Sequence, residues 1–356
     1  MKRKSLSFRP LLPVATLGLL SVSAQPFTPV DLGPVPTASP NRVSASFRMA
    51  FNVAVNFENI GAFNPGTSQT TPEGAAFNYD DGYVLTDSSG NTMGYTRYWG
   101  YNDNNQVSGV GTLLMHQYSS GGKSAAANLN EPLPGVELLY RRELGRGENM
   151  RWGLEAAGNY MSVDANDSRT LSEKVTRLTD AYPLPALEGG GYVTPPPAPY
   201  YHGSGLSPQG NPVIGATPVS STTDTLLASV SGSRSFEAHV IGWRLGPYLE
   251  MPVGEKVKLS LSGGLSLAYV ISDFNYNDSV AVPDVPGGSG GGSDSGLLVG
   301  GYIGGEVSYE LGKSWAVIGS AQFQYLGEYT QSEGGRTAVL DLSKTVFVAI
   351  GFSYSF

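Results

Sequence analysis

The final segment of the chain, from Thr345 to Phe356, constrains the fold more than any other feature. Apolar residues occupy every second position from Val346 to Phe356, and mostly small or polar residues fill the positions between them. A period of two predicts a β-strand with one apolar face and one polar face. A soluble protein rarely ends on an uncovered aromatic strand, whereas the last strand of a closed barrel pairs with the first. The segment therefore indicates a β-barrel with an apolar outer surface.

The aromatic residues Phe352, Tyr354 and Phe356 resemble the C-terminal strand of bacterial outer-membrane β-barrels. The resemblance is to the OmpA- and OmpX-type class of transmembrane barrels. It implies an integral protein of the bacterial outer membrane, surrounded by outer-membrane lipid. It also implies that these three residues form an assembly signal, read by the barrel-assembly machinery.

The N-terminal region predicts export. Lys2, Arg3 and Lys4 precede an apolar stretch at 11–22, and Val22-Ser-Ala24 offers small residues for cleavage. We expect a signal peptide over 1–24, followed by a proline-rich periplasmic leader over 25–42. The barrel domain then occupies 43–356.

Composition excludes several classes of function. The chain has no cysteine, which excludes disulfides and thiolate metal sites. Its net charge of −8 argues against binding to nucleic acid, which needs basic patches. No segment predicts a cofactor site, and we expect none.

Alternating segments and turns predict an antiparallel, all-β transmembrane barrel with eight strands favoured. Short turns at 145–149, 252–255 and 311–314 alternate with long loops at 58–133, 164–232 and 277–295. This alternation is typical of short periplasmic turns and long extracellular loops. Ten to twelve strands remain compatible, because 95–101 and 107–118 offer either two more barrel strands or an extracellular hairpin.

The alternation within the strands predicts which side chains face the interior. In the first strand, Phe47, Met49, Phe51, Val53, Val55 and Phe57 share one face, which we assign to lipid. The charged residues predicted to face the lumen are Arg48, Glu137, Arg141, Glu143, Arg151, Glu155, Arg244, Glu250, Lys258, Glu306 and Glu310. In a narrow barrel such charges pair as a structural plug, which we favour, whereas in a wider one they line a pore.

Two low-complexity stretches lie within the predicted loops. Pro195 to Tyr201 is a polyproline-prone run, predicted to be a stiff spacer or a ligand for a partner. Pro286 to Asp294 is rich in glycine and serine, and predicts a flexible loop tip.

Chemistry-bearing residues form no recognised catalytic or metal-binding motif. Ser235, Glu237 and His239 would share one strand face, but positions two apart on a strand are too distant for a proton relay. Asp80 and Asp81 precede Gly82, as turn residues commonly do, and the loop around Asp164 lacks the glycine of a calcium site. We therefore predict neither catalytic nor metal-binding residues.

These observations predict a non-enzymatic outer-membrane barrel that contributes to envelope structure or to surface interactions through its extracellular loops. An extracellular ligand would bind those loops. A small pore or uptake channel is the alternative, and a lipid-modifying enzyme is a more distant one.

Overall fold

The computed structural model describes residues 40–65, 69–71, 74–86, 93–129, 132–201 and 212–356. The predicted signal peptide lies outside the described residues, and so does the predicted leader up to residue 39. The end of that leader was misplaced by two residues, because Asn41 and Arg42 already belong to the first strand. Among the described residues, no helix is long and apolar enough to cross a membrane.

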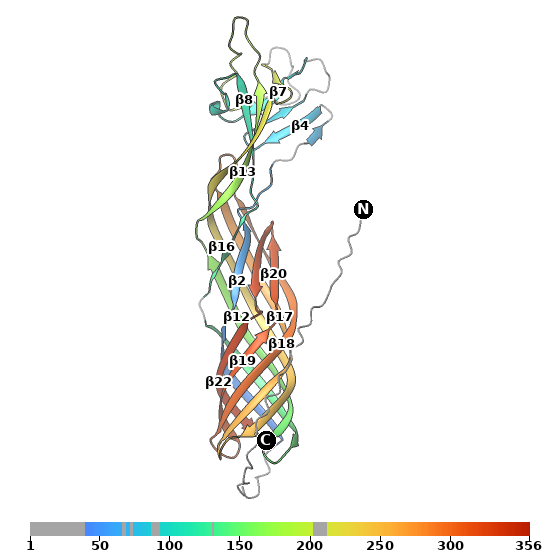
Figure 1. Ribbon diagram of the computed structural model, residues 1–356, viewed down its shortest axis with the longest axis vertical. Coiled ribbons are helices and arrows are strands. Elements are labelled where there is room, and N and C mark those ends of the chain that lie inside the picture. The colour runs from blue at the N-terminus through green and yellow to red at the C-terminus, as the bar shows by residue number, and fades with distance from the viewer. Residues whose placement is uncertain (1–39, 66–68, 72–73, 87–92, 130–131, 202–211) are drawn as a thin grey trace, which may run out of the picture. The chain divides into compact units, whose positions relative to one another are not determined.

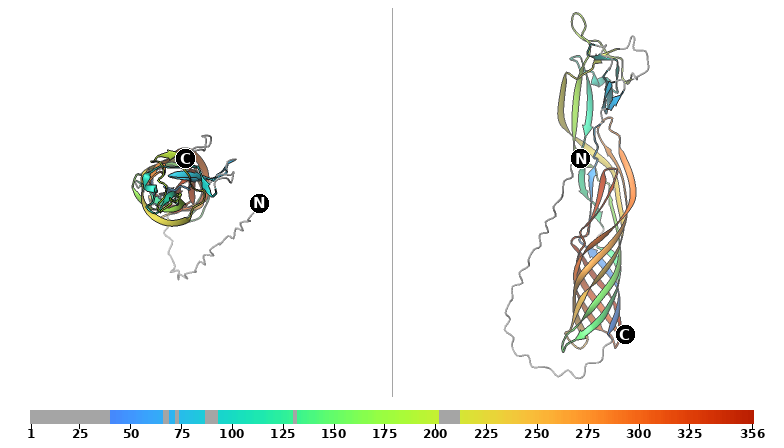
Figure 2. Two further views of the ribbon diagram at one scale, coloured as in Figure 1. Left: turned by 90° about the horizontal axis from the view of Figure 1, so that it is seen from above. Right: turned by 90° about the vertical axis from the view of Figure 1, so that its right-hand side faces the viewer.

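Eight antiparallel strands form a closed ring, the number favoured from the sequence (Figure 1, Figure 2). Each strand pairs with the next, β12 pairs with β16, and β22 pairs with β1 to complete the ring. In ring order the strands are β1 (Asn41–Phe51), β11 (Leu133–Arg146), β12 (Arg151–Asp167), β16 (Ser220–Pro252), β17 (Val257–Val280), β18 (Gly288–Glu310), β19 (Trp315–Tyr325) and β22 (Thr345–Ser355).

The outer face of the ring carries an apolar belt. Leu261, Leu265 and Ile350 are all more than half exposed, at 57%, 67% and 64%. Exposed aromatic residues stand at both borders of the belt: Trp152, Tyr309, Trp315 and Tyr354 toward the C-terminal end, and Tyr160, Tyr269 and Tyr325 at the other. Ten residues of tilted β17 between Leu259 and Tyr269 rise roughly 25 Å, which matches the hydrocarbon band of a membrane barrel.

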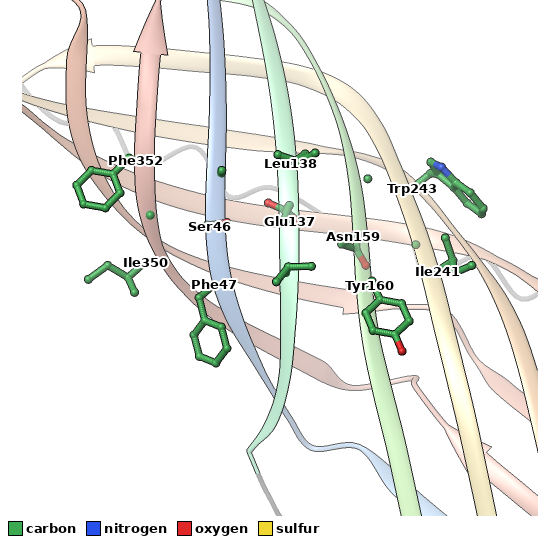
Figure 3. Close-up of a pocket in the computed structure, with 15 residues that line it drawn as sticks. Ser46, Phe47, Glu137, Leu138, Asn159, Tyr160, Ile241, Trp243, Ile350 and Phe352 are labelled. Atoms are coloured by element: carbon green, nitrogen blue, oxygen red, sulfur yellow. The ribbon is translucent and has the colours of Figure 1, made fainter.

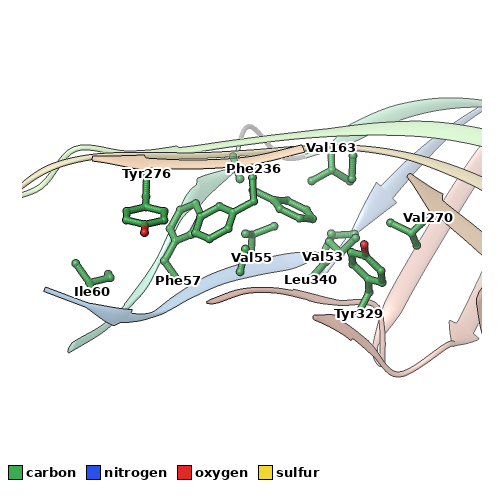
Figure 4. Packing of buried hydrophobic residues seen from close by; sticks show 14 of the residues in the cluster. Val53, Val55, Phe57, Ile60, Val163, Phe236, Val270, Tyr276, Tyr329 and Leu340 are labelled. Carbon is green, nitrogen blue, oxygen red and sulfur yellow. The ribbon is translucent and has the colours of Figure 1, made fainter. Parts of the chain in front are cut away.

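Beyond the belt, the ring is filled by an apolar core around a second sheet (Figure 4). This sheet has the order β20-β21-β2-β9. Its strands are β20 (Glu328–Glu333), β21 (Arg336–Asp341), β2 (Ala54–Ile60) and β9 (Lys123–Ala126). Phe57 of β2 stacks on Phe274 of β17, with ring centroids 5.8 Å apart. The interior therefore has a polar level within the belt and an apolar level beyond it.

The prediction that Phe47 through Phe57 share one lipid-facing side is wrong. Phe47 and Met49 are exposed, but Val53, Val55 and Phe57 are buried in the core. The backbone of Asn52 adopts a left-handed conformation with φ of 59°, and this irregularity turns the following residues inward.

The three predicted long loops also contain regular structure. The region 277–295 is largely strand, because β17 continues to Val280 and β18 begins at Gly288, so the flexible tip predicted there is wrong. Glycine in the first part of β18 makes room for the inner sheet. A Cβ on Gly296, for example, would lie 2.9 Å from the ring of Tyr329. The region 164–232 contains β13 (Leu171–Pro183) and the first residues of β16, which pair with each other.

Much of the region 58–133 forms a β-module with its own core. Its strands are β3 (Gln69–Thr71), β4 (Gly74–Tyr79), β5 (Gly82–Leu85), β6 (Tyr95–Thr96), β7 (Tyr98–Tyr101) and β8 (Thr112–Ser119), with a short helix η1 (Asn104–Gln106) between β7 and β8. The rest of the region supplies β9 to the inner sheet and β10 (Asn128–Leu129), which pairs with β12 of the ring. Trp99, Leu113 and Met115 are fully buried in the module, and β8 pairs with β13. Residues 95–101 and 107–118 therefore add no strand to the ring.

The polyproline run packs against this module. Tyr101 donates a hydrogen bond from its hydroxyl to the carbonyl of Pro196, and Ala198 N–H donates to Asn104 Oδ1 at 2.8 Å. Two short strands, β14 (Tyr200–Tyr201) and β15 (Ile214–Gly215), pair with β7 and β6. The run is thus engaged within its own chain, and the prediction of a spacer or partner ligand gives way to a structural role.

Candidate functional site

The charged residues predicted for the lumen all lie at inward-facing positions of the ring. Most are buried, whereas Glu143, Arg151, Lys258 and Glu310 are partly exposed near the C-terminal end of the barrel. Every one of them takes part in an ion pair. Among the described residues, Lys258 and Glu310 pair only with each other, and the remaining nine belong to one network.

The network is a continuous chain in which arginine and glutamate alternate. Along the chain the residues are Arg48, Glu137, Arg244, Glu155, Arg141, Glu306, Arg42, Glu250, Arg151, Glu143 and Arg146. Arg48 Nη1 lies 2.6 Å from Glu137 Oε2, and Arg141 Nε lies 2.8 Å from Glu155 Oε2. We call these eleven residues the Arg–Glu chain.

Several links of the Arg–Glu chain cross the barrel. Arg141 on β11 donates from Nη1 to Glu306 Oε1 on β18 at 2.5 Å, and these strands stand four places apart in the ring of eight. Arg42 on β1 reaches Glu250 on β16, three places away, at 2.8 Å. Side chains from opposite walls are therefore in direct contact. The eight most buried members, four arginines and four glutamates, have no net charge.

Aromatic rings cover the guanidinium groups where carboxylates do not. The Cζ atom of Arg48 lies 3.5 Å from the ring centroid of Phe347, and that of Arg244 lies 5.0 Å from the ring of Tyr302. The Tyr302 hydroxyl also donates to Glu155 Oε1 at 3.0 Å. A cation over an aromatic face gains up to about 2 kcal/mol when it is desolvated.

Sequence reasoning missed Arg42, Tyr302 and Phe347. Arg42 was assigned to the proline-rich leader, although it shares the alternation that places Arg48 inside. Tyr302 and Phe347 occupy inward positions where an aromatic residue was not expected next to charges. The alternation of inward-facing and outward-facing residues along each strand could have identified all three, if it had been applied to every residue of the ring.

The outer wall of the belt carries a shallow apolar groove of about 790 Å³ (Figure 3). Phe47, Tyr160, Trp243 and Phe352 project around it, whereas Glu137 belongs to the opposite face of the wall. Because the groove lies within the belt and its projecting side chains are mostly apolar, we assign it to lipid contact.

The three residues of the predicted assembly signal lie on the outer face at the C-terminal end. Phe352, Tyr354 and Phe356 are 58%, 41% and 53% exposed. The ring of Tyr354 lies 5.0 Å from that of Trp315 on the neighbouring strand. The three rings therefore form part of the aromatic border of the belt.

The residues weighed for catalysis do not assemble into a relay. His239 lies outside the barrel and shares a hydrogen bond of 2.7 Å with the hydroxyl of Tyr160, on which it stacks. Ser235 and Glu237 lie on the same strand, β16, four and two residues before His239 and on the same face. Within the described part of the chain, no group of three or more metal-ligating side chains is suitably placed for a metal ion.

Asp80 and Asp81 cover the free edge of β8 in the β-module. Tyr118 N–H donates to Asp80 Oδ2 at 2.6 Å, and His116 N–H donates to Asp81 Oδ1 at 2.8 Å. Burial raises the pKa of Asp80, and the neighbouring Asp81 and Asp284 raise it further, while the Tyr118 N–H lowers it. These carboxylates thus bind backbone N–H groups of β8 on the side where none of the described strands pairs with it.

Comparison with known proteins gives structural likeness alone. No protein-family model matches the sequence, and no curated protein matches it. The attachment invasion locus protein Ail of Yersinia pestis, solved with the heparin analogue sucrose octasulfate, has 9% identity and a TM-score of 0.26, over 88% of this chain and 98% of Ail. The outer-membrane protease OmpT of Escherichia coli has 12% identity and a TM-score of 0.35, over 90% of this chain and 99% of OmpT.

The class of the protein follows from its own geometry. A closed ring of antiparallel strands, an apolar belt with aromatic borders and a polar interior are together the features of an outer-membrane β-barrel. A closed barrel also satisfies every backbone hydrogen bond between strands, as lipid requires. The chain is therefore an integral β-barrel protein of the bacterial outer membrane.

Proposed function

We propose that this protein is a sealed outer-membrane barrel that holds a folded β-module at the cell surface and acts without catalysis, in envelope structure or surface contact. The observation that carries this proposal is the Arg–Glu chain, whose links join opposite walls of the barrel. An eight-stranded barrel is only just wide enough for its side chains to fill the interior.

The seal has two levels. At the polar level, a passing ion would have to separate buried ion pairs, and leaving one buried partner unpaired costs about 3–5 kcal/mol. At the apolar level, Val55, Phe57 and Leu340 are each at most 1% exposed. Together the two levels argue against the alternative of a pore or uptake channel.

We assign the C-terminal end of the barrel to the periplasm. The three short connections lie at this end, as is usual for periplasmic turns, and the longer connections with the β-module then face the outside. On this assignment a signal peptide over 1–24 directs export, and Phe352, Tyr354 and Phe356 engage the barrel-assembly machinery. An extracellular ligand would meet the β-module.

Proteoliposomes test this proposal. We expect liposomes that contain the purified protein to retain trapped sucrose as well as empty liposomes do. Efflux of sucrose through the wild-type protein would favour a channel instead. For orientation, cysteine at the 86%-exposed Val110 should react with an impermeant thiol reagent on intact cells, and cysteine at Gly254 should not.

A further inference from the structure

The upper part of β18 has a free edge. Along its whole length β18 pairs with β17, from Val257↔Tyr309 to Asp278↔Gly288, without a break in register. Its pairing with β19 stops at Gly301↔Tyr325, and among the described residues no strand pairs with residues 288–300 on that side. Thirteen consecutive residues thus present an unpaired edge, beginning at the outer border of the belt.

The register shows which backbone groups face this edge. Glu310 N–H donates to Lys256 O of the β17 side, so even-numbered residues of β18 bond to β17. Leu311 N–H donates to Trp315 O, so odd-numbered residues bond to β19 where β19 is present. Both groups of one residue point to the same side in an antiparallel ladder. The free N–H and C=O groups therefore belong to Ser289, Gly291, Ser293, Ser295, Leu297 and Val299.

The inner sheet does not cover the edge. Gly327, with φ of 81°, turns the chain after β19, and β20 pairs only with β21. Gln331 of β20 donates from Nε2 to Gly292 O at 2.6 Å, an even-numbered carbonyl that faces away from the free edge. None of the described strands therefore fills, above Gly301, the position beside β18 that β19 occupies below it.

The edge lacks the usual protection. Natural edge strands are blocked by proline, lysine, bulges or short length. Residues 288–300 contain no proline and no lysine, and their pairing with β17 contains no bulge. Nine of these thirteen residues are glycine or serine, and most of the segment is exposed, so another backbone can approach closely.

A second copy of the chain does not fit this edge. Two barrels in one membrane are related by rotation about the membrane normal, which keeps both β18 strands pointing outward. Because barrel strands tilt by about 40°, two facing copies of β18 would cross at roughly 80°. Strands that cross at this angle cannot form a ladder.

The charge around the edge selects the partner. Asp294 lies within the segment, Asp273 of β17 accepts a hydrogen bond from Ser293, and Glu333 of β20 lies next to Gly292. Arg336, which lies next to Gly288, is already 3.2 Å from Asp278. We propose that residues 288–300 bind an extended cationic peptide segment by β-strand addition, in which the peptide continues the line of β19. This interaction does not depend on whether the lumen conducts.

A model peptide tests this proposal on the full-length protein in nanodiscs. The probe is a fluorescent octapeptide of alternating lysine and valine. Matched peptides carry glutamate in place of lysine, or N-methyl groups on alternate amides that block strand pairing. We expect the lysine peptide to bind and both matched peptides to bind at least tenfold more weakly. Equal binding of the N-methylated peptide, or no binding of the lysine peptide, would overturn the proposal.

Two further readouts locate the binding. Ser295→Pro removes one edge-facing N–H, whereas Ser295→Ala loses the same hydroxyl contact with Tyr269 and keeps the N–H. We expect the proline variant alone to weaken binding. In the wild type, hydrogen exchange at the odd-numbered amides of 289–299 should be fast without peptide and slow with it. Unchanged exchange would place the peptide elsewhere, whether or not the proline variant folds.

Discussion

Arg141 and Glu306 meet across the full width of the barrel, with 2.5 Å between Nη1 and Oε1. Each also forms an ion pair with a further member of the Arg–Glu chain, Arg141 with Glu155 and Glu306 with Arg42. The pair therefore joins the two halves of the Arg–Glu chain and connects opposite walls of the barrel.

Removing one partner of this pair should destabilise the barrel strongly. Glu306→Met removes the carboxylate that Arg141 Nη1 contacts and leaves one more arginine than glutamate among the buried members. We expect the free energy of unfolding in lipid bilayers to fall by about 3 kcal/mol. The double variant Arg141→Met with Glu306→Met should recover part of this loss, because it leaves fewer unpaired charges. Arg177→Ala, which breaks an exposed ion pair with Asp224 between β13 and β16, is the control and should change little. Additive losses in the double variant would contradict the pairing.

Charge on the two faces of β17 should have different effects. Leu261 faces lipid and Ser262 faces the interior. Leu261→Arg should lower the free energy of unfolding by about 2–4 kcal/mol near the middle of the bilayer. Ser262→Arg should crowd the interior and leave the lipid-facing surface unchanged. Binding of the variant to detergent micelles and bilayers can show that this surface is intact. Equal folding of both variants in bilayers would show that the faces are misassigned.

The glycine-rich part of β18 should not tolerate side chains that point toward the inner sheet. A Cβ at Gly296 would lie 2.9 Å from the ring of Tyr329, whereas nothing lies within 4 Å of a Cβ at Gly254. Gly296→Val should therefore cost about 1–3 kcal/mol by overpacking, as urea unfolding would measure. Gly254→Val is the matched control, and a similar loss there would point to backbone effects instead.

The stability of the β-module should fall as pH rises through the range where Asp80 ionises. Its pKa is raised in the folded state by burial first, so the folded protein holds the proton more tightly than the unfolded chain. The resulting stability is fully present below the ordinary aspartate pKa of about 3.9 and is lost above it, as pH passes the raised value. Exchange of the Tyr118 amide, corrected for its intrinsic rate, should report this. Asp80→Asn should remove the dependence, and an unchanged slope would assign it to another group.

The features that could be predicted from the sequence are those set by strand parity and turn spacing. The terminal strand, the three short turns and the inward positions from Arg48 to Glu310 all follow from local alternation. The partners within the Arg–Glu chain did not follow, because they depend on which strands face each other across the ring.

Other features were hidden because local signals were ambiguous. Apolar residues alternate on both sides of Asn52, so nothing in the pattern marked the change of face there. The glycines of 288–296 have the composition of a linker, but they occupy a strand whose inner neighbour, the β20–β21 pair, leaves little room for side chains.

Single-channel recording in planar bilayers tests the central claim, that the Arg–Glu chain and the apolar core close the lumen. We predict that wild-type protein gives no stepwise conductance under conditions in which a known porin conducts. The Arg141→Ala, Glu306→Ala double variant serves to show whether loss of the polar level alone opens a path past the apolar core. Regular conductance steps from the folded wild-type barrel would contradict the account.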